Sequence, residues 1–126
     1  MSKLNKYTFN YHPLFQKEFN KIIKKHQCPS LEQDLERLKF TLIQHLEDNN
    51  EFKATLCNRI AGLDSKVTLP AFIVKNFRCK GINKGSHSGF RITFVFFRDE
   101  NIFYFVEIFN KNKKSIEDKK RINDIF

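Results

Sequence analysis

The sequence predicts an α+β fold, in which an antiparallel sheet packs against a hairpin of two N-terminal helices and a short helix ends the chain. Three observations predict it. Residues 14–50 carry apolar side chains with helical spacing, residues 72–109 contain apolar runs typical of strands, and the 126 residues include no internal repeat or Pro/Gly/Ser-rich linker. A chain of this length can bury one core, so we expect residues 1–126 to form a single domain.

The N-terminal region predicts a short strand and a first helix. Tyr7, Phe9 and Tyr11 alternate with polar residues up to Pro13, which is the pattern of a strand with one buried face. From Leu14 the apolar period becomes helical. The buried face of this helix is expected to carry Phe15, Phe19, Ile22, Ile23 and His26, and the opposite face Lys17, Lys21, Lys24 and Lys25.

A second helix is predicted directly after Cys28-Pro29. Ser30 and Gln33 have the spacing of a capping box, in which each side chain reaches a backbone N–H at the start of the helix. One stripe of leucines marks the buried face, at Leu31, Leu35, Leu38, Leu42 and Leu46. The Asp-Asn-Asn sequence at residues 48–50 is expected to end the helix. Two amphipathic helices joined by a tight turn predict an antiparallel hairpin that covers an apolar surface.

The second half of the chain predicts the sheet. Residues 59–63 fit a short strand ending in a glycine turn, and residues 72–80 fit the next strand. Residues 90–98 and 102–109 are two nearly continuous apolar runs, and the Asp-Glu-Asn sequence between them is typical of a hairpin. Because both runs are apolar on both faces, we expect central strands that are covered on each side.

The C-terminal region predicts a last short helix that starts at Ser115. Glu117 and Asp118 fall in its first turn, where the helix dipole favours negative charge. With Arg121 they are interpreted as charges that stabilise this helix rather than as catalytic groups.

The net charge of +9 and the isoelectric point near 9.6 favour a polyanionic partner. Nucleic acid, an acidic membrane surface and an acidic protein all fit this charge, and so does a solvated lysine-rich surface without a partner. The distribution of the charge along the chain is more informative than its sum.

The cysteines and histidines predict neither a disulfide scaffold nor a metal site. Cys28, Cys57 and Cys79 are an odd number without a short CxxC spacing, so we expect reduced thiols. His12, His26 and His45 show no ligand pattern. The N-terminal residues lack the apolar run of a signal peptide, and the apolar run at residues 90–97 is too short to span a bilayer. A cytoplasmic protein without a membrane segment is therefore expected.

The positive charge is concentrated in one acid-free stretch. No Asp or Glu occurs between Asp64 and Asp99. The interleaved Phe77, His87 and Phe90 suit a surface that binds a phosphate backbone and stacks on bases. Strand alternation is expected to place Lys75 and Phe77 on one face and Arg78 and Lys80 on the other. The basic residues of the stretch are Lys66, Lys75, Arg78, Lys80, Lys84, Arg91 and Arg98.

Arg91 lies between Phe90 and Ile92 in the middle of an apolar run. An arginine in such a place is held by a partner or serves a site. One interpretation is an ion pair with Glu107 on the adjacent strand. The other is a ligand-binding role, and the two are compatible if Glu107 orients the guanidinium.

Taken together, the sequences VKNFRCKGINKGSHSGFRITFVF and FVEIFNKNKKSIEDKKRI resemble the RelE/HigB-like branch of the RelE/ParE toxin superfamily. The matching motifs are K-x-x-R-C before a glycine-containing basic loop, S-G-F-R at the start of a strand, E-I-F-x-K at the end of the next, and E-D-x-x-R-I near the C-terminus. The resemblance is most specific over residues 75–122. It implies a RelE-like fold, a curved antiparallel sheet backed by a helical hairpin.

The resemblance also implies a function. Such proteins are toxins of type II toxin–antitoxin systems. They inhibit translation as mRNA interferases, endoribonucleases that cut mRNA on the ribosome, and a small acidic antitoxin protein neutralises them. The reaction needs no metal or small-molecule cofactor. The RNA 2′-hydroxyl attacks the adjacent phosphate and leaves a 2′,3′-cyclic phosphate and a 5′-hydroxyl, while cations stabilise the transition state.

The motifs assign roles to individual residues. By resemblance, Arg91 contacts the scissile phosphate, and Lys75, Arg78 and Lys84 supply further catalytic cations. Lys80, Arg98, Lys111 and Phe77 are expected to bind RNA. Several relatives carry a tyrosine in the last helix for proton transfer, but Glu117 and Asp118 occupy that region here. His87 is a possible substitute because its ordinary pKa is near neutrality; the alternative is that it is an ordinary loop residue.

Two other functions fit the same sequence. A ParE-like toxin would bind DNA gyrase without enzymatic activity, although the clustered cations and the S-G-F-R motif favour RNA. A catalytically inactive module that binds RNA or antitoxin would explain the missing tyrosine.

Overall fold

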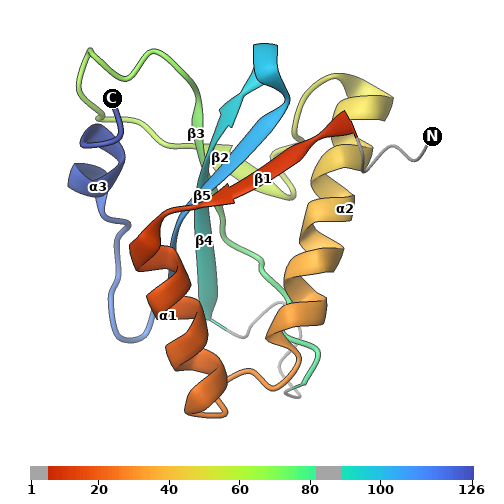
Figure 1. The fold of residues 1–126 in the computed structure, drawn as a ribbon, viewed down its shortest axis with the longest axis vertical. Coiled ribbons are helices and arrows are strands. Elements are labelled where there is room, and N and C mark those ends of the chain that lie inside the picture. The colour runs from red at the N-terminus through yellow and green to blue at the C-terminus, as the bar shows by residue number, and fades with distance from the viewer. Residues whose placement is uncertain (1–5, 82–88) are drawn as a thin grey trace.

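The computed structural model describes residues 6–81 and 89–126 and has a five-stranded mixed sheet with helices on both faces (Figure 1). The order of the strands across the sheet is β1-β5-β4-β3-β2. The α+β class and the order of elements are confirmed, whereas the prediction of an antiparallel sheet is wrong for β1, which pairs with β5 in parallel. The elements are β1 (Thr8–Tyr11), α1 (Pro13–Lys24), α2 (Leu31–Asn49), β2 (Cys57–Arg59), β3 (Ala71–Val74), β4 (Phe90–Phe97), the 3-10 turn η3 (Arg98–Glu100), β5 (Ile102–Asn110) and α3 (Lys119–Asn123).

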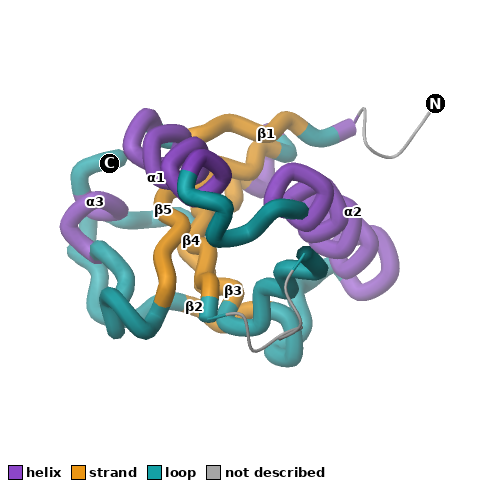
Figure 2. Tube along the Cα trace, turned by 90° about the horizontal axis from the view of Figure 1, so that it is seen from below, coloured by secondary structure: helices purple, strands orange, loops and turns teal. Residues whose placement is uncertain are grey.

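The sheet separates two apolar clusters, as the runs in its central strands predicted. The larger cluster contains the leucine stripe of α2, Phe15 and Ile22 of α1, and the even-numbered side chains of β4. The smaller cluster lies on the opposite face and contains Ile122 of α3 and Val95 of β4. We call these the helical-hairpin face and the α3 face. In Figure 2 the sheet is seen nearly edge-on, with α2 and α3 on opposite sides of it.

The N-terminal strand and helix follow directly from the sequence pattern. The Phe9 ring stacks on Phe103 with 5.2 Å between centroids, so the alternating aromatic residues secure β1 to β5. His12 is the N-cap of α1, because its Nδ1 accepts a hydrogen bond of 3.0 Å from the N–H of Leu14. Pro13 suits the first position of the helix, where no intrahelical N–H is needed. All five leucines of the α2 stripe are buried, which confirms the predicted face.

Three element boundaries differ from the predictions. β3 ends at Val74 rather than Lys80, so alternation no longer fixes the faces of the residues beyond it: Phe77 is buried whereas Lys75 is exposed. Helix α3 begins at Lys119, and Asp118 caps it by accepting the N–H of Arg121. The short strand that was expected at residues 59–63 corresponds to β2, which begins two residues earlier, at Cys57, and ends at Arg59.

The start of α2 has no capping box. The Ser30 hydroxyl donates to Asp34 at 2.7 Å and accepts the N–H of Gly81 at 2.6 Å, so it is not available to cap its own helix. Nearby, a disulfide joins Cys28 and Cys79, and the prediction of three reduced thiols is wrong. The pairing bridges 51 residues of sequence and leaves no signature in the spacing. Cys57 is free and buried, and burial raises its pKa to about 12.

Across the described ranges, none of the helices has the length and apolar character that crossing a bilayer requires.

Candidate functional site

A β-bulge in β5 shapes the polar centre of the α3 face. Thr93 of β4 pairs with Glu107, but the next residue, Phe94, pairs with Phe105, so Val106 is the extra residue of β5. A bulge of this kind puts two residues of one strand opposite one residue of its partner. Glu107 contacts the segment before α3, and Val106 belongs to the cluster on the α3 face. The bulge therefore directs a carboxylate into an apolar face.

Glu107 is buried with 2 % exposure and is held by the C-terminal segment. The Lys114 ammonium group donates to one carboxylate oxygen, and the backbone N–H of Asp118 donates to the other at 2.8 Å. The ammonium group also lies 5.4 Å from the centroid of the Phe109 ring. The charge of Glu107 is thus paired with Lys114, and the ion pair with Glu107, one of the two interpretations of Arg91, is not formed among the described residues.

Arg91 and Thr93 are the polar side chains of β4 on the α3 face. Arg91 pairs with Phe109 in the sheet, two residues before Thr93 on the same strand. The Arg91 Nε and the Thr93 Oγ1 are both buried, and neither has a hydrogen-bond partner within residues 6–81 and 89–126. Burying a donor without a partner costs free energy. A ligand that accepts hydrogen bonds at this point would remove that cost.

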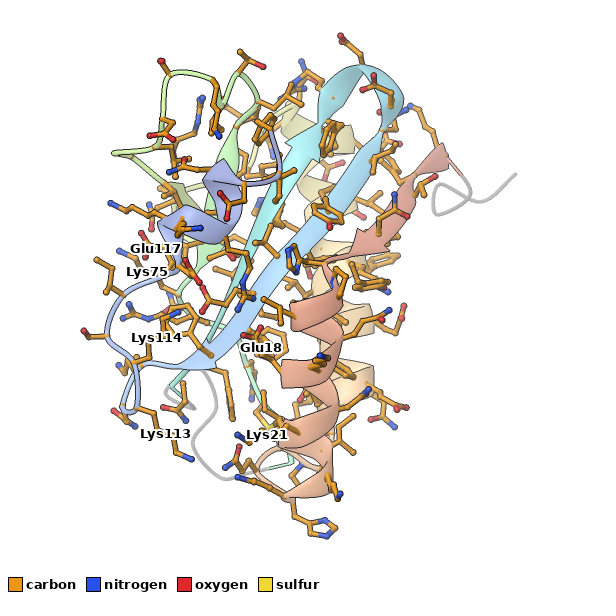
Figure 3. All side chains as sticks on the ribbon, turned by 60° about the vertical axis from the view of Figure 1, so that its left-hand side comes forward. Glu18, Lys21, Lys75, Lys113, Lys114 and Glu117 are labelled. Atoms are coloured by element: carbon orange, nitrogen blue, oxygen red, sulfur yellow. A yellow bond between two sulfur atoms is a disulfide. The ribbon has the colours of Figure 1, made fainter. Side chains whose placement is uncertain are left out.

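Four further cations surround this part of the sheet. Lys75 follows Val74, which pairs with Ile92, so it emerges from β3 beside the β4 strand that carries Arg91. The N–H of Lys111 donates to the Gly89 carbonyl at 2.8 Å, which places Lys111 beside the start of β4. Lys75, Lys113 and Lys114 lie on the side of the molecule shown in Figure 3. Of these, only Lys114 forms an ion pair among the described residues.

The remaining predicted residues divide into three groups. Arg78 and Lys80 are exposed in the irregular segment after β3 and form no ion pair in the part of the chain that the structure describes. Lys84 and His87 lie outside the described residues. Phe77 is 3 % exposed, so the prediction that it stacks on bases is wrong.

Arg98 lies at the opposite end of β4. Its guanidinium bonds the Asn50 side chain at 3.2 Å and lies 5.5 Å from the centre of the Phe96 ring. Seven residues of strand separate it from Arg91, about 23 Å at ~3.3 Å per residue. It therefore contacts the end of α2 and does not contribute to a shared site with Arg91.

An ion-pair network fixes α3 beside this site. The Arg121 guanidinium donates to both Glu18 oxygens, at 3.0 and 2.8 Å, and to the Val106 carbonyl at 2.8 Å. Glu18 in turn accepts the N–H of Ile108 at 3.2 Å. The pairing of β1 with β5 ends at Tyr11 and Phe105, so the Val106 carbonyl and the Ile108 N–H have no partner in β1. Burial disfavours the charged form of Arg121, but its bonds to Glu18 outweigh this and raise its pKa.

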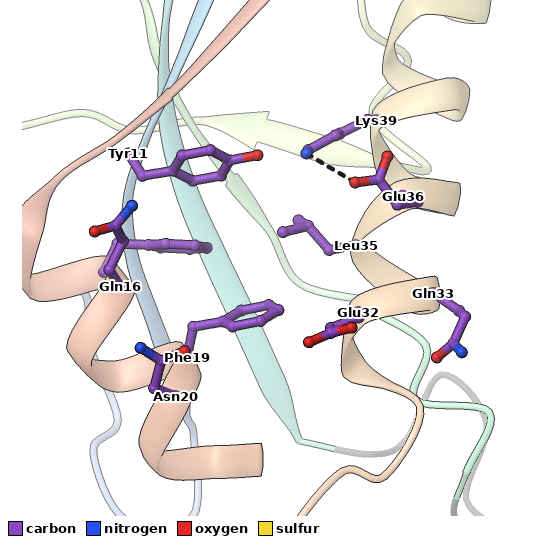
Figure 4. A pocket seen from close by; sticks show the side chains of 10 residues that line it. Tyr11, Gln16, Phe19, Asn20, Glu32, Gln33, Leu35, Glu36 and Lys39 are labelled. Carbon is purple, nitrogen blue, oxygen red and sulfur yellow. Dashed lines mark hydrogen bonds and ion pairs between the residues drawn. The ribbon is translucent and has the colours of Figure 1, made fainter. Parts of the chain in front are cut away.

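A cleft of about 750 Å³ lies between α1 and α2 (Figure 4). The two helices run in opposite directions, as predicted, but they are splayed over the sheet (Figure 1). Tyr11, Phe19 and Leu35 form its apolar wall. The Lys39 ammonium group lies 5.1 Å from the Tyr11 ring centroid and 3.0 Å from a Glu36 oxygen. Burial opposes the charge of Lys39, but the hydrogen bonds that its ammonium group donates to Tyr11 and Glu36 dominate and raise its pKa.

One group of side chains has donor atoms close enough to share a metal ion in the described ranges. Cys28, Asp34 and Cys79 have donor atoms within 4.8 Å of one another, and all three are buried. The two sulfur atoms are joined in the disulfide. The group was not foreseen, because its members are brought together only by the fold.

Comparison with known proteins adds no family to this description. No protein-family model, no curated protein and no solved structure matches the chain. The resemblance to RelE/HigB-like toxins therefore stays a prediction from the motifs.

Proposed function

We propose that the chain is an mRNA endonuclease of the RelE type and the toxin of a type II toxin–antitoxin pair, with its site on the α3 face at Arg91. The observation that carries this proposal is the buried Arg91 Nε without a partner, next to the partnerless hydroxyl of Thr93. Both groups can donate hydrogen bonds. Lys75 and Lys111 are nearby, and the one carboxylate at the centre, Glu107, is neutralised by Lys114.

This arrangement suits a phosphate with developing charge. When the RNA 2′-hydroxyl loses its proton, its oxygen bonds to the adjacent phosphorus and the P–O5′ bond breaks. The products are a 2′,3′-cyclic phosphate and a 5′-hydroxyl, which takes up a proton. Arginine stays protonated at all physiological pH values and presents several N–H donors. Arg91 would therefore stabilise the pentavalent transition state, and Lys75 would hold a neighbouring phosphate.

Proton transfer has no assigned residue in this proposal. Glu107 already holds Lys114 and the N–H of Asp118, and His87 lies outside the described residues. Binding without cleavage is consequently the second candidate function. It is favoured by one specific feature, the absence of tyrosine from α3 and the segment before it.

Mapping RNA ends tests the proposal. Purified chain is incubated with single-stranded RNA and, separately, with translating ribosomes, and the 5′ ends and terminal groups of the products are determined. We expect cyclic phosphate and 5′-hydroxyl ends, and a cleavage rate at least ~100-fold lower for Arg91→Ala, as for loss of one donor to a transition state. Arg98→Ala is the matched control and should cleave normally.

Other outcomes distinguish the alternatives. RNA that is bound but stays intact would support the binding module. Intact RNA with inhibited DNA supercoiling by gyrase would contradict the RNA proposal in favour of a ParE-like toxin. Co-expression with the neighbouring gene tests the partner: expression of the chain alone should arrest growth, and a small acidic protein from that gene should relieve the arrest.

A further inference from the structure

The segment after β3 is tied to the start of α2 at three points. The Cys28–Cys79 disulfide is the covalent one. The N–H of Lys80 donates to Asp34 at 3.2 Å, and the N–H of Gly81 donates to Ser30 at 2.6 Å. We call residues 75–81 the tethered segment. It carries three exposed cations, Lys75, Arg78 and Lys80.

Gly81 shows how closely the tethered segment approaches α2. A Cβ atom at this position would lie 2.9 Å from the Ser30 Oγ and 3.0 Å from its backbone nitrogen. Real Cβ contacts are longer, so a side chain here would push the segment away from the helix. The position of the basic side chains in this segment thus depends on a tight local contact.

The buried carboxylate of Asp34 suits both oxidation states of the cysteine pair. One of its oxygens lies 3.4 Å from the Cys28 sulfur, a hydrogen-bond distance for a thiol. A disulfide sulfur has no proton to donate, whereas a reduced Cys28 would donate to Asp34. Asp34 is 1 % exposed and also accepts from Ser30, Arg37 and Lys80. The surroundings of the pair therefore stay hydrogen-bonded when the disulfide opens.

The disulfide is buried, but the residues that directly follow Cys79 are exposed to solvent. Both sulfurs belong to residues with no exposed area, yet Lys80 and Gly81, which follow Cys79, are exposed. Breaking the two backbone hydrogen bonds to Asp34 and Ser30 would release these two residues. Segments held by few bonds open locally far more often than the whole chain unfolds. A small thiol can then reach the disulfide.

We propose that Cys28 and Cys79 form a reversible thiol–disulfide site that controls how firmly the tethered segment presents Arg78 and Lys80 to RNA. This inference rests on the proposed RNA-binding function. In the reduction, the thiolate of a small dithiol attacks one sulfur and forms a mixed disulfide with it. The second thiol of the reagent then displaces that cysteine. The protein gains two electrons and two protons, and the reagent leaves as its own disulfide.

Reduction leaves the side chains of Arg78 and Lys80 chemically unchanged. It changes only how firmly the tethered segment that carries them is held. The disulfide holds Cys79 covalently, whereas after reduction the segment is held by non-covalent contacts, which include the two backbone hydrogen bonds and the packing of Phe77 in the core. Ordering flexible side chains on binding has a cost that preorganisation removes. The oxidised chain should therefore bind RNA more tightly than the reduced chain.

The test compares the full chain in its oxidised form and after treatment with dithiothreitol. Mass spectrometry after alkylation identifies each form, and Cys57 serves as the internal reference because it is unpaired in both. We expect hydrogen exchange at the amides of Lys80 and Gly81 to be at least ~10-fold faster after reduction. RNA affinity, measured with a 2′-O-methyl oligonucleotide, should fall about fivefold.

Matched variants separate the thiol chemistry from a packing defect. Cys79→Ser should behave as the reduced chain in the absence of reductant and should not respond to dithiothreitol. Cys57→Ser should keep the full response. Equal amide exchange in the two forms, or failure of the reduced pair to re-form the disulfide, would overturn the proposal. Different exchange with no RNA binding in either form would overturn the proposed function while retaining the redox-sensitive tether.

Discussion

The Arg91 Nε and the Thr93 Oγ1 are buried without hydrogen-bond partners in the part of the chain that the structure describes, as is the Arg121 Nε. Proteins normally pair such atoms, and an exception suggests a place kept for a ligand. The neighbouring Glu107 is equally buried but fully bonded. Because Glu107 is already bonded and the Arg91 Nε is not, we propose Arg91, rather than Glu107, as the centre of the site.

Two histidines make the stability of the chain sensitive to pH. His12 accepts the N–H of Leu14 and His45 accepts the N–H of Lys53, each through Nδ1. The pKa of each is lowered, first by burial and then by a nearby cation, Arg121 or Lys53. The unfolded chain, with a histidine pKa of about 6.5, therefore binds more protons below that pH.

The free energy of unfolding should consequently decrease as the pH falls from 7 to 5. We expect the His12→Asn/His45→Asn variant to lose most of this dependence, because asparagine can accept the same N–H at any pH in this range. Urea denaturation at pH 7 and pH 5 measures the effect. His26→Asn is the control, since His26 is exposed. A wild-type chain with equal stability at both pH values would contradict this account.

At the scale of elements, the long helices and the central hairpin were predictable because their signals are local. The spacing of the leucines in α2 and of the aromatic residues in β1 predicts which face of each element is buried. The end of β3 was not predictable, because polar and apolar residues still alternate over residues 76–80, after the ladder has ended. The β-bulge at Val106 likewise depends on the register between two strands and leaves no pattern in either.

The candidate site was predictable in part for the same reason. Arg91 was recognisable as a charge inside an apolar run, whereas Lys114 and Thr93 gave no local signal. The Cys28–Cys79 disulfide and the Glu18–Arg121 pair both join distant parts of the chain. Contacts of this kind are set by the packing of elements.

Helix α3 has only five residues and should depend on Arg121 for its position. Arg121 is almost fully buried against Glu18 and the Val106 carbonyl. Removing one partner of a fully buried pair costs about 3 kcal/mol, but the Glu18 side chain is 28 % exposed and stays partly solvated. We therefore expect Arg121→Ala to lower the free energy of unfolding in urea denaturation by less than this, by about 2 kcal/mol. Lys120→Ala removes an exposed pair with Asp124 and should not change stability; an equal loss in both variants would contradict the anchoring role.

On the scale of the whole molecule, the sheet separates the larger apolar core from the face on which we propose that RNA binds. The helical-hairpin face carries the larger core, including Phe94, Phe103 and Phe105, all fully buried. The α3 face has a smaller core and gathers Arg91, Thr93 and the lysines that follow β3 and β5. The acid-free stretch between Asp64 and Asp99 contains β3 and β4 and carries seven basic residues.

The central claim is that RNA phosphate binds at Arg91, and the salt dependence of binding tests it most directly. The affinity of a 2′-O-methyl oligonucleotide is measured from 50 to 200 mM salt for the wild type, Arg91→Gln and Arg98→Gln. Loss of one phosphate contact on a single strand lowers the slope of log K against log salt by about 0.7. We predict this change, with about tenfold weaker binding, for Arg91→Gln alone. Equal slopes for all three chains, or the larger loss in Arg98→Gln, would contradict the account.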